Sequence, residues 1–197
     1  MCLLLETIRV KDGKFCYPGY HQKRMDNSRN VHFPAGQPIN IHDIPIPETA
    51  GTGIFKSRII YDQVIREVEF RPYSEKVIRT IRLVKADHLE YPFKYLDRSG
   101  IEQLQKEHPG FDEVIFVKNG LITDSSFSNL AFLSGNKWFT PDQPLLDGTC
   151  RQRLIDVGEL HPVQITYTDL VSYSHVSLIN AMIDLKRVIL PIEVIVW

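Results

Sequence analysis

Lys94 is the residue of the sequence best placed to act as a nucleophile. It lies among aromatic residues in the segment YPFKYLDR. Apolar surroundings disfavour the ammonium form, so they lower the pKa of a lysine and favour a reactive amine. The same setting also suits a linker lysine whose stem packs on Tyr91 and Phe93 while its charged end stays in water. Composition alone favours this plainer interpretation.

Two further positions could recognise charged parts of a ligand. Asp124 follows a strand pattern in ITDSSFSN, where a carboxylate could pair with a cationic ligand nitrogen or simply close a turn. Residues 146–149 (LDGT) run directly into a predicted helix. The free N–H groups at a helix N-terminus bind phosphate well, although an ordinary capped helix start has the same pattern.

Arg24, in the segment HQKRM, is the fourth candidate. An arginine fork can hold a phosphate through two hydrogen bonds, whereas a solvated charge on a helix face is the plain alternative. None of the four signals is specific by itself. The seven histidines show no His-x-x-x-His spacing and the cysteines no Cys-x-x-Cys pair, so no metal site is predicted.

Charge and composition exclude several classes of protein. Lys and Arg number 23 and Asp and Glu 24, so the chain lacks the basic surplus of a typical nucleic-acid binder. No apolar run reaches the roughly 20 residues of a membrane span, and the first residues read as a strand and not as a signal peptide. Three unpatterned cysteines fit a reducing cytoplasm.

Hydrophobic patterns predict an α+β protein with two domains. Strands are expected at residues 3–10, 14–17, 54–61, 64–73, 77–86, 112–117, 121–126, 129–133, 137–140, 163–168, 175–183 and 187–197. Helices are expected at residues 20–29, 97–107 and 151–157, the second opening on an Asp cap. We expect an N-terminal sheet domain over residues 1–90, a linker over 91–97 that carries Lys94, and a mixed domain over 98–197.

Five segments in this order resemble the class IV aminotransferase family, the fold-type IV pyridoxal-phosphate enzymes. They are LETIRVKDGK (5–14), HQKRM (21–25), KYLDR (94–98), DEVIFVKNGLITDSSFSNLAF (112–132) and LLDGTCRQ (145–152). The resemblance covers most of the chain. It implies a two-domain fold like that of D-amino acid aminotransferase, with a shortened N-terminal domain.

The resemblance also implies a role for each candidate residue. Lys94 would bind pyridoxal 5'-phosphate as a Schiff base and then shuttle protons, and Asp124 would keep the ring nitrogen protonated. Arg24 and the backbone N–H groups of Thr149 and Cys150 would hold the phosphate. Asn180, in LINAMI, matches a polar position near the phosphate in the lyase branch.

KYLDR and Thr7 favour the 4-amino-4-deoxychorismate lyase branch, in which a threonine takes part in catalysis. Such an enzyme releases pyruvate and leaves 4-aminobenzoate for folate synthesis. A branched-chain or D-amino acid transaminase is the alternative, since the same chemistry begins both reactions. Asp124 stands where the family usually has Glu, and the N-terminal domain is short, so a catalytically degenerate binding protein is the third hypothesis. The family further implies a cytoplasmic homodimer that acts on a small amino substrate.

Overall fold

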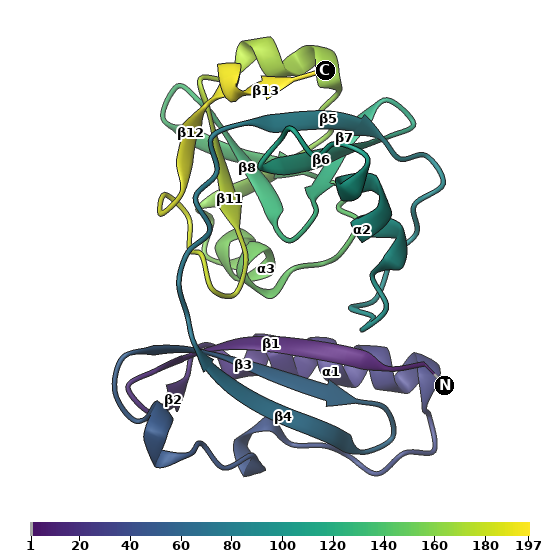
Figure 1. Cartoon of the computed structure of the whole chain (residues 1–197), viewed down its shortest axis with the longest axis vertical. Coiled ribbons are helices and arrows are strands. Elements are labelled where there is room, and N and C mark those ends of the chain that lie inside the picture. The colour runs from purple at the N-terminus through teal and green to yellow at the C-terminus, as the bar shows by residue number, and fades with distance from the viewer. Residues whose placement is uncertain (1) are drawn as a thin grey trace. The chain divides into compact units, whose positions relative to one another are not determined.

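The computed structural model describes residues 2–197, which divide into two compact units (Figure 1). Unit 1 comprises Met1–Glu75 and Phe93–Asp97, and unit 2 comprises Lys76–Pro92 and Arg98–Trp197. Each unit has its own sheets and its own hydrophobic core.

Unit 1 is an antiparallel sheet of order β2-β1-β3-β4 with one long helix. Its elements are β1 (Leu4–Lys11), β2 (Lys14–Phe15), α1 (Pro18–His32), β3 (Ile54–Tyr61) and β4 (Ile65–Pro72). The turn between β1 and β2 places Asp12 and Gly13 at φ 47° and 72°, the left-handed conformation that a two-residue hairpin requires. β1 and β3 pair along their whole lengths, so the positions of β1 are fixed relative to those of β3.

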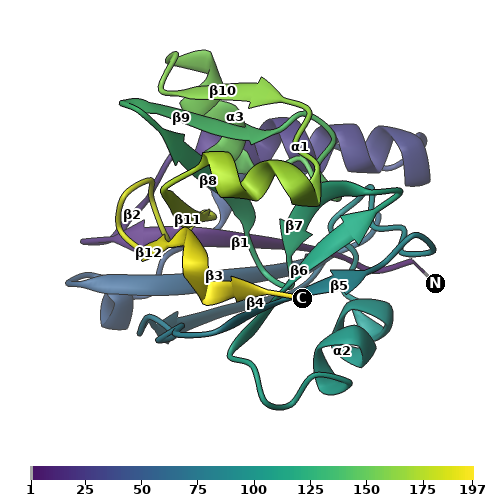
Figure 2. The same cartoon turned by 90° about the horizontal axis from the view of Figure 1, so that it is seen from above.

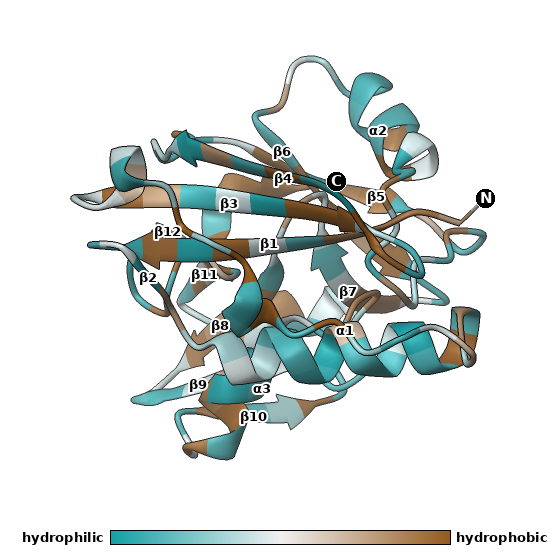
Figure 3. Cartoon of the chain, turned by 90° about the horizontal axis from the view of Figure 1, so that it is seen from below, coloured by the Kyte–Doolittle hydropathy of each residue, from teal (hydrophilic) through white to brown (hydrophobic). Residues whose placement is uncertain are grey.

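Helix α1 packs against one face of this sheet, although its surface is mostly hydrophilic (Figure 3). It begins at Pro18, whose missing N–H costs nothing in the first turn of a helix. The residues that α1 buries are His21, Met25, Ser28 and Arg29, three of them polar. Buried polar groups need hydrogen-bond partners, so this face of α1 packs through specific hydrogen bonds as well as through apolar contact.

Unit 2 contains two sheets, of order β10-β9-β8-β11-β12 and β13-β5-β6-β7. The strands are β5 (Ile81–Lys85), β6 (Glu113–Lys118), β7 (Leu121–Ser125), β8 (Asn129–Ser134), β9 (Lys137–Pro141), β10 (Leu160–Val163), β11 (His175–Ile179), β12 (Ile189–Pro191) and β13 (Ile195–Val196). Helices α2 (Ser99–Lys106) and α3 (Thr149–Asp156) complete the unit, and α3 lies beside β10 (Figure 2). The strands of both sheets share one core that includes Leu83, Ile115, Phe132 and Leu178.

Most predicted elements are present, but the domain boundary is not where the sequence placed it. The run at residues 77–86 forms β5, which pairs in parallel with β6 and therefore belongs to unit 2. The chain changes unit after Glu75 instead of near residue 90, and Phe93–Asp97 returns to unit 1. Parallel pairing joins strands that are far apart in sequence, and hydrophobic alternation carries no information on the partner strand.

Two local predictions were also wrong. Residues 163–168 do not form one strand, because β10 ends at Val163. A 3-10 helix follows at Tyr167–Ser172, with Thr166 as its N-terminal cap. Helix α2 starts after Arg98 without a side-chain cap, so Asp97 is not its capping residue. Among residues 2–197, no helix is long and apolar enough to cross a membrane.

Candidate active site

Glu6 of β1 lies at the centre of a buried charged cluster in unit 1. Its side chain is fully buried and points toward α1, in a row that otherwise contains Leu4, Ile8 and Val10. Arg24 donates from Nε to Oε1 over 2.8 Å and from a terminal nitrogen to Oε2 over 2.6 Å. His21 Nδ1 lies 2.7 Å from Oε2. The structure therefore pairs Arg24 with Glu6, and phosphate binding by Arg24 stays a prediction.

The cluster fixes the ionisation of its members. Burial alone would raise the pKa of Glu6, but the charge and hydrogen bonds of Arg24, together with His21, lower it to about 2. Burial lowers the pKa of His21 more than Glu6 raises it, and the charges of Arg24 and Lys94 add to the lowering. Near neutral pH, a neutral imidazole thus donates to an ionised carboxylate.

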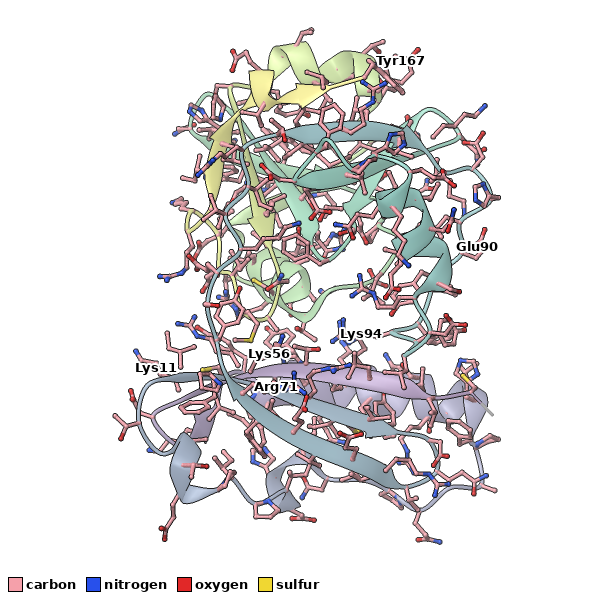
Figure 4. The ribbon with its side chains drawn as sticks, in the orientation of Figure 1. Lys11, Lys56, Arg71, Glu90, Lys94 and Tyr167 are labelled. Atoms are coloured by element: carbon pink, nitrogen blue, oxygen red, sulfur yellow. The ribbon has the colours of Figure 1, made fainter. Side chains whose placement is uncertain are left out.

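Lys94 belongs to unit 1 because its segment pairs with the edge of β1 (Figure 4). Leu5 N donates to Lys94 O over 2.9 Å, and Leu96 N donates to Leu3 O over 2.9 Å. These bonds fix the backbone from the carbonyl of Lys94 to the N–H of Leu96. The charge of Lys94 acts on His21. A lysine held on a strand edge is better ordered than one in a free linker, which suits a residue that must bind a ligand covalently.

Phe93 and Tyr95, the sequence neighbours of Lys94, pack on His32, the last residue of α1. Phe93 and Tyr95 both contact His32 edge-on, with ring centroids 4.7 Å and 5.7 Å away. Tyr95 Oη also lies 3.4 Å from His32 Nε2. Tyr91 belongs to unit 2, whereas Lys94 belongs to unit 1. Packing of the Lys94 stem on Tyr91 stays a prediction.

Thr7 lies on the face of the sheet opposite Glu6, where basic side chains gather. Thr7 pairs with Arg58, and the next row across the three strands is Arg9, Lys56 and Arg71. Residues directly opposite on neighbouring strands share one face, so these cations form a continuous row. Glu69 lies opposite Arg58 in the neighbouring row and forms ion pairs with Arg58 and Arg71. The surplus of positive charge makes this face suited to a ligand with carboxylate groups.

Asp124 of β7 is a buried carboxylate of unit 2. Only 5% of its surface is exposed. Asn129 Nδ2 donates to Oδ1 over 2.8 Å, and Leu146 N donates to Oδ2 over 2.9 Å. Burial raises the pKa of Asp124 to about 7 despite these bonds and the charge of Arg151. Both donors, the Asn129 amide and the Leu146 backbone N–H, are neutral. A cation beside Asp124 would stabilise its ionised form.

The N-terminus of α3 is the second ligand-binding feature of unit 2. Gly148 occupies the capping position, no side chain caps the helix, and the first turn contains no acidic residue. Thr149 and Cys150 are its first residues, so α3 begins before the predicted start at residue 151. Phosphate binding by their backbone N–H groups stays a prediction. Burial, with help from Asp184, raises the pKa of Cys150 to about 12, so the thiol stays protonated. The chemistry of this end of α3 is that of backbone N–H groups and a positive dipole, which suit a phosphate.

Asn180 closes a turn in the structure. Its Oδ1 accepts hydrogen bonds from Met182 N and Ile183 N over 2.8 and 3.0 Å, and its Nδ2 donates to Phe127 O over 3.3 Å. The side chain thus holds the loop between β7 and β8 against the end of β11. Direct contact between Asn180 and a phosphate stays a prediction.

The candidate residues of each unit fit pyridoxal phosphate in kind. Lys94 offers an amine for its aldehyde, Asp124 offers a carboxylate for its ring nitrogen, and α3 offers an uncapped N-terminus for its phosphate. The sequence had assigned no role to Glu6 or Asn129. A single acidic residue on the apolar face of a predicted strand is the signal that could have identified Glu6.

Comparisons with known proteins identify the family of the chain. The family model for amino-transferase class IV matches residues 58–195. An uncharacterised protein from Haemophilus influenzae is 35% identical over 182 residues, which cover 91% of this chain and 97% of the relative.

Solved structures show the same fold. A proposed 4-amino-4-deoxychorismate lyase from Haemophilus somnus superposes with a TM-score of 0.87 at 34% identity, over 94% of this chain and 98% of that chain. A hypothetical aminotransferase from Mycobacterium tuberculosis, in its pyridoxal-phosphate-bound form, has a TM-score of 0.70 at 18% identity, over 91% and 78%. The α+β fold predicted from the sequence, that of the fold-type IV enzymes, is confirmed.

Proposed function

Since the chain belongs to the class IV aminotransferase family, we propose that it is a pyridoxal-phosphate enzyme of the 4-amino-4-deoxychorismate lyase type. The observation that carries the cofactor assignment is Asp124, a buried carboxylate whose hydrogen bonds come from neutral donors. Burying such a group is costly unless a cation completes it, and a protonated pyridine nitrogen is such a cation.

Each candidate residue would hold a different part of the cofactor. Lys94 would bind it covalently, Asp124 would bind the ring nitrogen, and the first N–H groups of α3 would bind the phosphate, with Arg24 and Asn180 as further predicted contacts. When bound, pyridoxal phosphate supplies an electron sink that stabilises negative charge on the carbon next to the substrate amine.

The chain's own groups would then move protons and orient the substrate. Lys94 would take the proton from the carbon that bears the amine. Cleavage of the ether bond would release the three-carbon part as enolpyruvate, which takes up a proton to become pyruvate, and the ring would become aromatic. The substrate carries two carboxylates, and the row of Arg9, Lys56 and Arg71 beside Thr7 supports this substrate class.

Adding pyridoxal phosphate to the purified protein should produce a yellow, protein-bound chromophore. The protein should then release pyruvate from aminodeoxychorismate with no amino acceptor present. A protein that stays colourless would overturn the cofactor assignment. Bound cofactor with turnover that strictly requires a 2-oxo acid would overturn the lyase assignment.

A transaminase is the second candidate function, because the family model is that of the aminotransferases. A 2-oxo acid requirement is its signature. A binding protein without catalysis is the third, motivated by Asp124 in place of the usual Glu. Full biological function of a Lys94→Ala variant would favour it.

The proposal includes a homodimer in the cytoplasm, a role in folate synthesis and a small amino substrate as partner. These remain predictions of family membership. Light scattering of the purified protein would test the oligomeric state, with a mass of one chain as the contradicting result.

A further inference from the structure

Asn129 joins the two ligand-binding features of unit 2 through one side chain. It lies at the start of β8 and is 5% exposed. Its Nδ2 donates to Asp124 Oδ1 over 2.8 Å and to Leu146 O over 2.9 Å. Leu146 N returns to the other carboxylate oxygen of Asp124 over 2.9 Å. The three groups form a closed set of hydrogen bonds between β7, β8 and the residues that precede α3.

Gly148 fits against the other end of the same amide. A Cβ at this position would lie 1.8 Å from Asn129 Oδ1, far closer than any real contact. The φ of Gly148 is −74°, which every residue adopts, so its backbone does not require glycine. The position is restricted to glycine because the Asn129 amide occupies the space, and this contact places the capping residue of α3 directly on Asn129.

We infer that Asn129 is a positioning residue that holds the Asp124 carboxylate at a fixed orientation and a fixed distance from the N-terminus of α3. The inference rests on the proposed function, in which Asp124 and α3 bind opposite ends of one pyridoxal phosphate. A rigid cofactor needs both contacts at one spacing, and a small displacement of either weakens both. Asn129 sets this spacing without touching the reacting atoms.

Arg151 is the charged side chain of α3 that acts on Asp124. It donates to Pro141 O over 2.8 Å and lies 3.5 Å from Asp147, and the charges of Asp147 and Asp142 act on it in turn. Arg151 is unchanged in every variant below, so its charge acts on the pKa of Asp124 in all of them. A change in the titration of Asp124 between the variants then reports the loss of the Asn129 bond.

The test uses the full chain without cofactor and the variant Asn129→Ala. Carbon-13 NMR of labelled aspartate follows the titration of Asp124, identified by the signal that Asp124→Asn removes. Loss of a hydrogen bond to the carboxylate should raise the pKa of Asp124. The dissociation constants for pyridoxal phosphate and for inorganic phosphate should both rise, the first by about 10- to 100-fold. Unchanged titration with dissociation constants within twofold of the wild type would overturn the inference.

Leu130→Ala is the matched control, because Leu130 is the next residue of β8, is fully buried and belongs to the apolar core. It should destabilise unit 2 and leave the titration of Asp124 and both dissociation constants unchanged. If Leu130→Ala weakens binding as much as Asn129→Ala does, general destabilisation explains the effect and the inference fails.

A second variant pair covers the case in which Asn129→Ala does not fold. As a single substitution, Gly148→Ala should weaken cofactor binding. In the Asn129→Ala background the same substitution should change the dissociation constant little, since the opposing amide is gone. For a poorly folding variant, Asn129→Ser takes the place of Asn129→Ala. Additive effects of the two substitutions would overturn the inference. A wild type that does not bind pyridoxal phosphate overturns the proposed function itself, whereas normal binding by every variant overturns only the role of Asn129.

Discussion

Unit 1 and unit 2 each contain a buried carboxylate, Glu6 and Asp124, and the two carboxylates are held in opposite ways. Glu6 accepts hydrogen bonds from Arg24 and His21, and its pKa falls to about 2. Asp124 accepts hydrogen bonds from an amide and a backbone N–H, and its pKa rises to about 7. Burial opposes ionisation in both, so the difference comes from the partners.

Under the proposed function, this difference separates a structural carboxylate, Glu6, from a ligand-binding carboxylate, Asp124. Glu6 has its cation within the chain, and its ionisation is complete without any ligand. Asp124 is half neutralised by its surroundings near pH 7, and a ligand cation would restore its charge. The predictions below test this distinction in order of expected size.

The largest effect is expected from Glu6→Ala, which leaves Arg24 and His21 buried without their carboxylate. Breaking a buried ion pair costs about 3–5 kcal/mol, so the free energy of unfolding in urea at pH 7 should fall by that amount. Glu67→Ala, at an exposed position of β4, is the control and should change it by less than about 0.5 kcal/mol. Equal losses in the two variants would remove the distinction between the clusters.

Asp124 should make the cofactor-free protein less stable as pH rises. Its folded pKa of about 7 lies above the ordinary aspartate pKa of 3.8, so the folded state binds the proton more tightly than the unfolded state. The stabilisation is complete below pH 3.8 and is lost as pH rises through about 7, a loss on the order of 4 kcal/mol. In Asp124→Asn this part of the pH dependence should vanish. Parallel curves of unfolding free energy against pH for the two proteins would contradict the assignment.

Glu6 should act in the opposite direction and at lower pH. Its folded pKa of about 2 lies below the ordinary glutamate pKa of 4.5, so its stabilisation is present above pH 4.5 and is lost as pH falls through about 2. This loss is on the order of 3 kcal/mol. Glu6→Gln should be less stable than the wild type at pH 7, with the difference shrinking on acidification, as thermal unfolding would measure. A constant difference from pH 7 to pH 2 would count against the ion pair.

The smallest effect is expected on catalysis by Asp124 variants. Asp124→Asn removes a charge-assisted hydrogen bond to the proposed ring nitrogen, so kcat/KM for pyruvate release should fall about 100-fold. Asp124→Glu keeps the charge and should stay within about tenfold of the wild type. Equal activities of Asp124→Asn and the wild type would place the proposed ring contact elsewhere.

The sequence predicted the elements whose signals are local. Asn119 and Gly120 adopt φ 51° and 82°, which produce the tight turn that the Asn-Gly pair predicts between β6 and β7. Residues 146–149 do lead into α3, which begins at Thr149. The family segments around Lys94 and Asp124 made both residues candidates, and their roles stay predictions. These features depend on neighbours in sequence and on resemblance, which one chain can supply.

The features that the sequence did not predict depend on contacts between residues far apart in the chain. Glu6 meets His21 and Arg24 across 15 and 18 positions, and β5 finds its parallel partner β6 beyond α2. The pairing of Arg24 with Glu6 was therefore not foreseen, although the sequence had selected Arg24. The role of Gly148 likewise depends on Asn129, 19 positions earlier, since backbone conformation alone does not require glycine there.

Borohydride reduction of the protein with pyridoxal phosphate, followed by peptide mapping, tests the central claim most directly. The account predicts one phosphopyridoxyl group per chain, on the peptide that contains Lys94, and its absence in Lys94→Ala. Label on another lysine, or none in a folded wild-type protein, would contradict the claim that Lys94 and Asp124 belong to a pyridoxal-phosphate site.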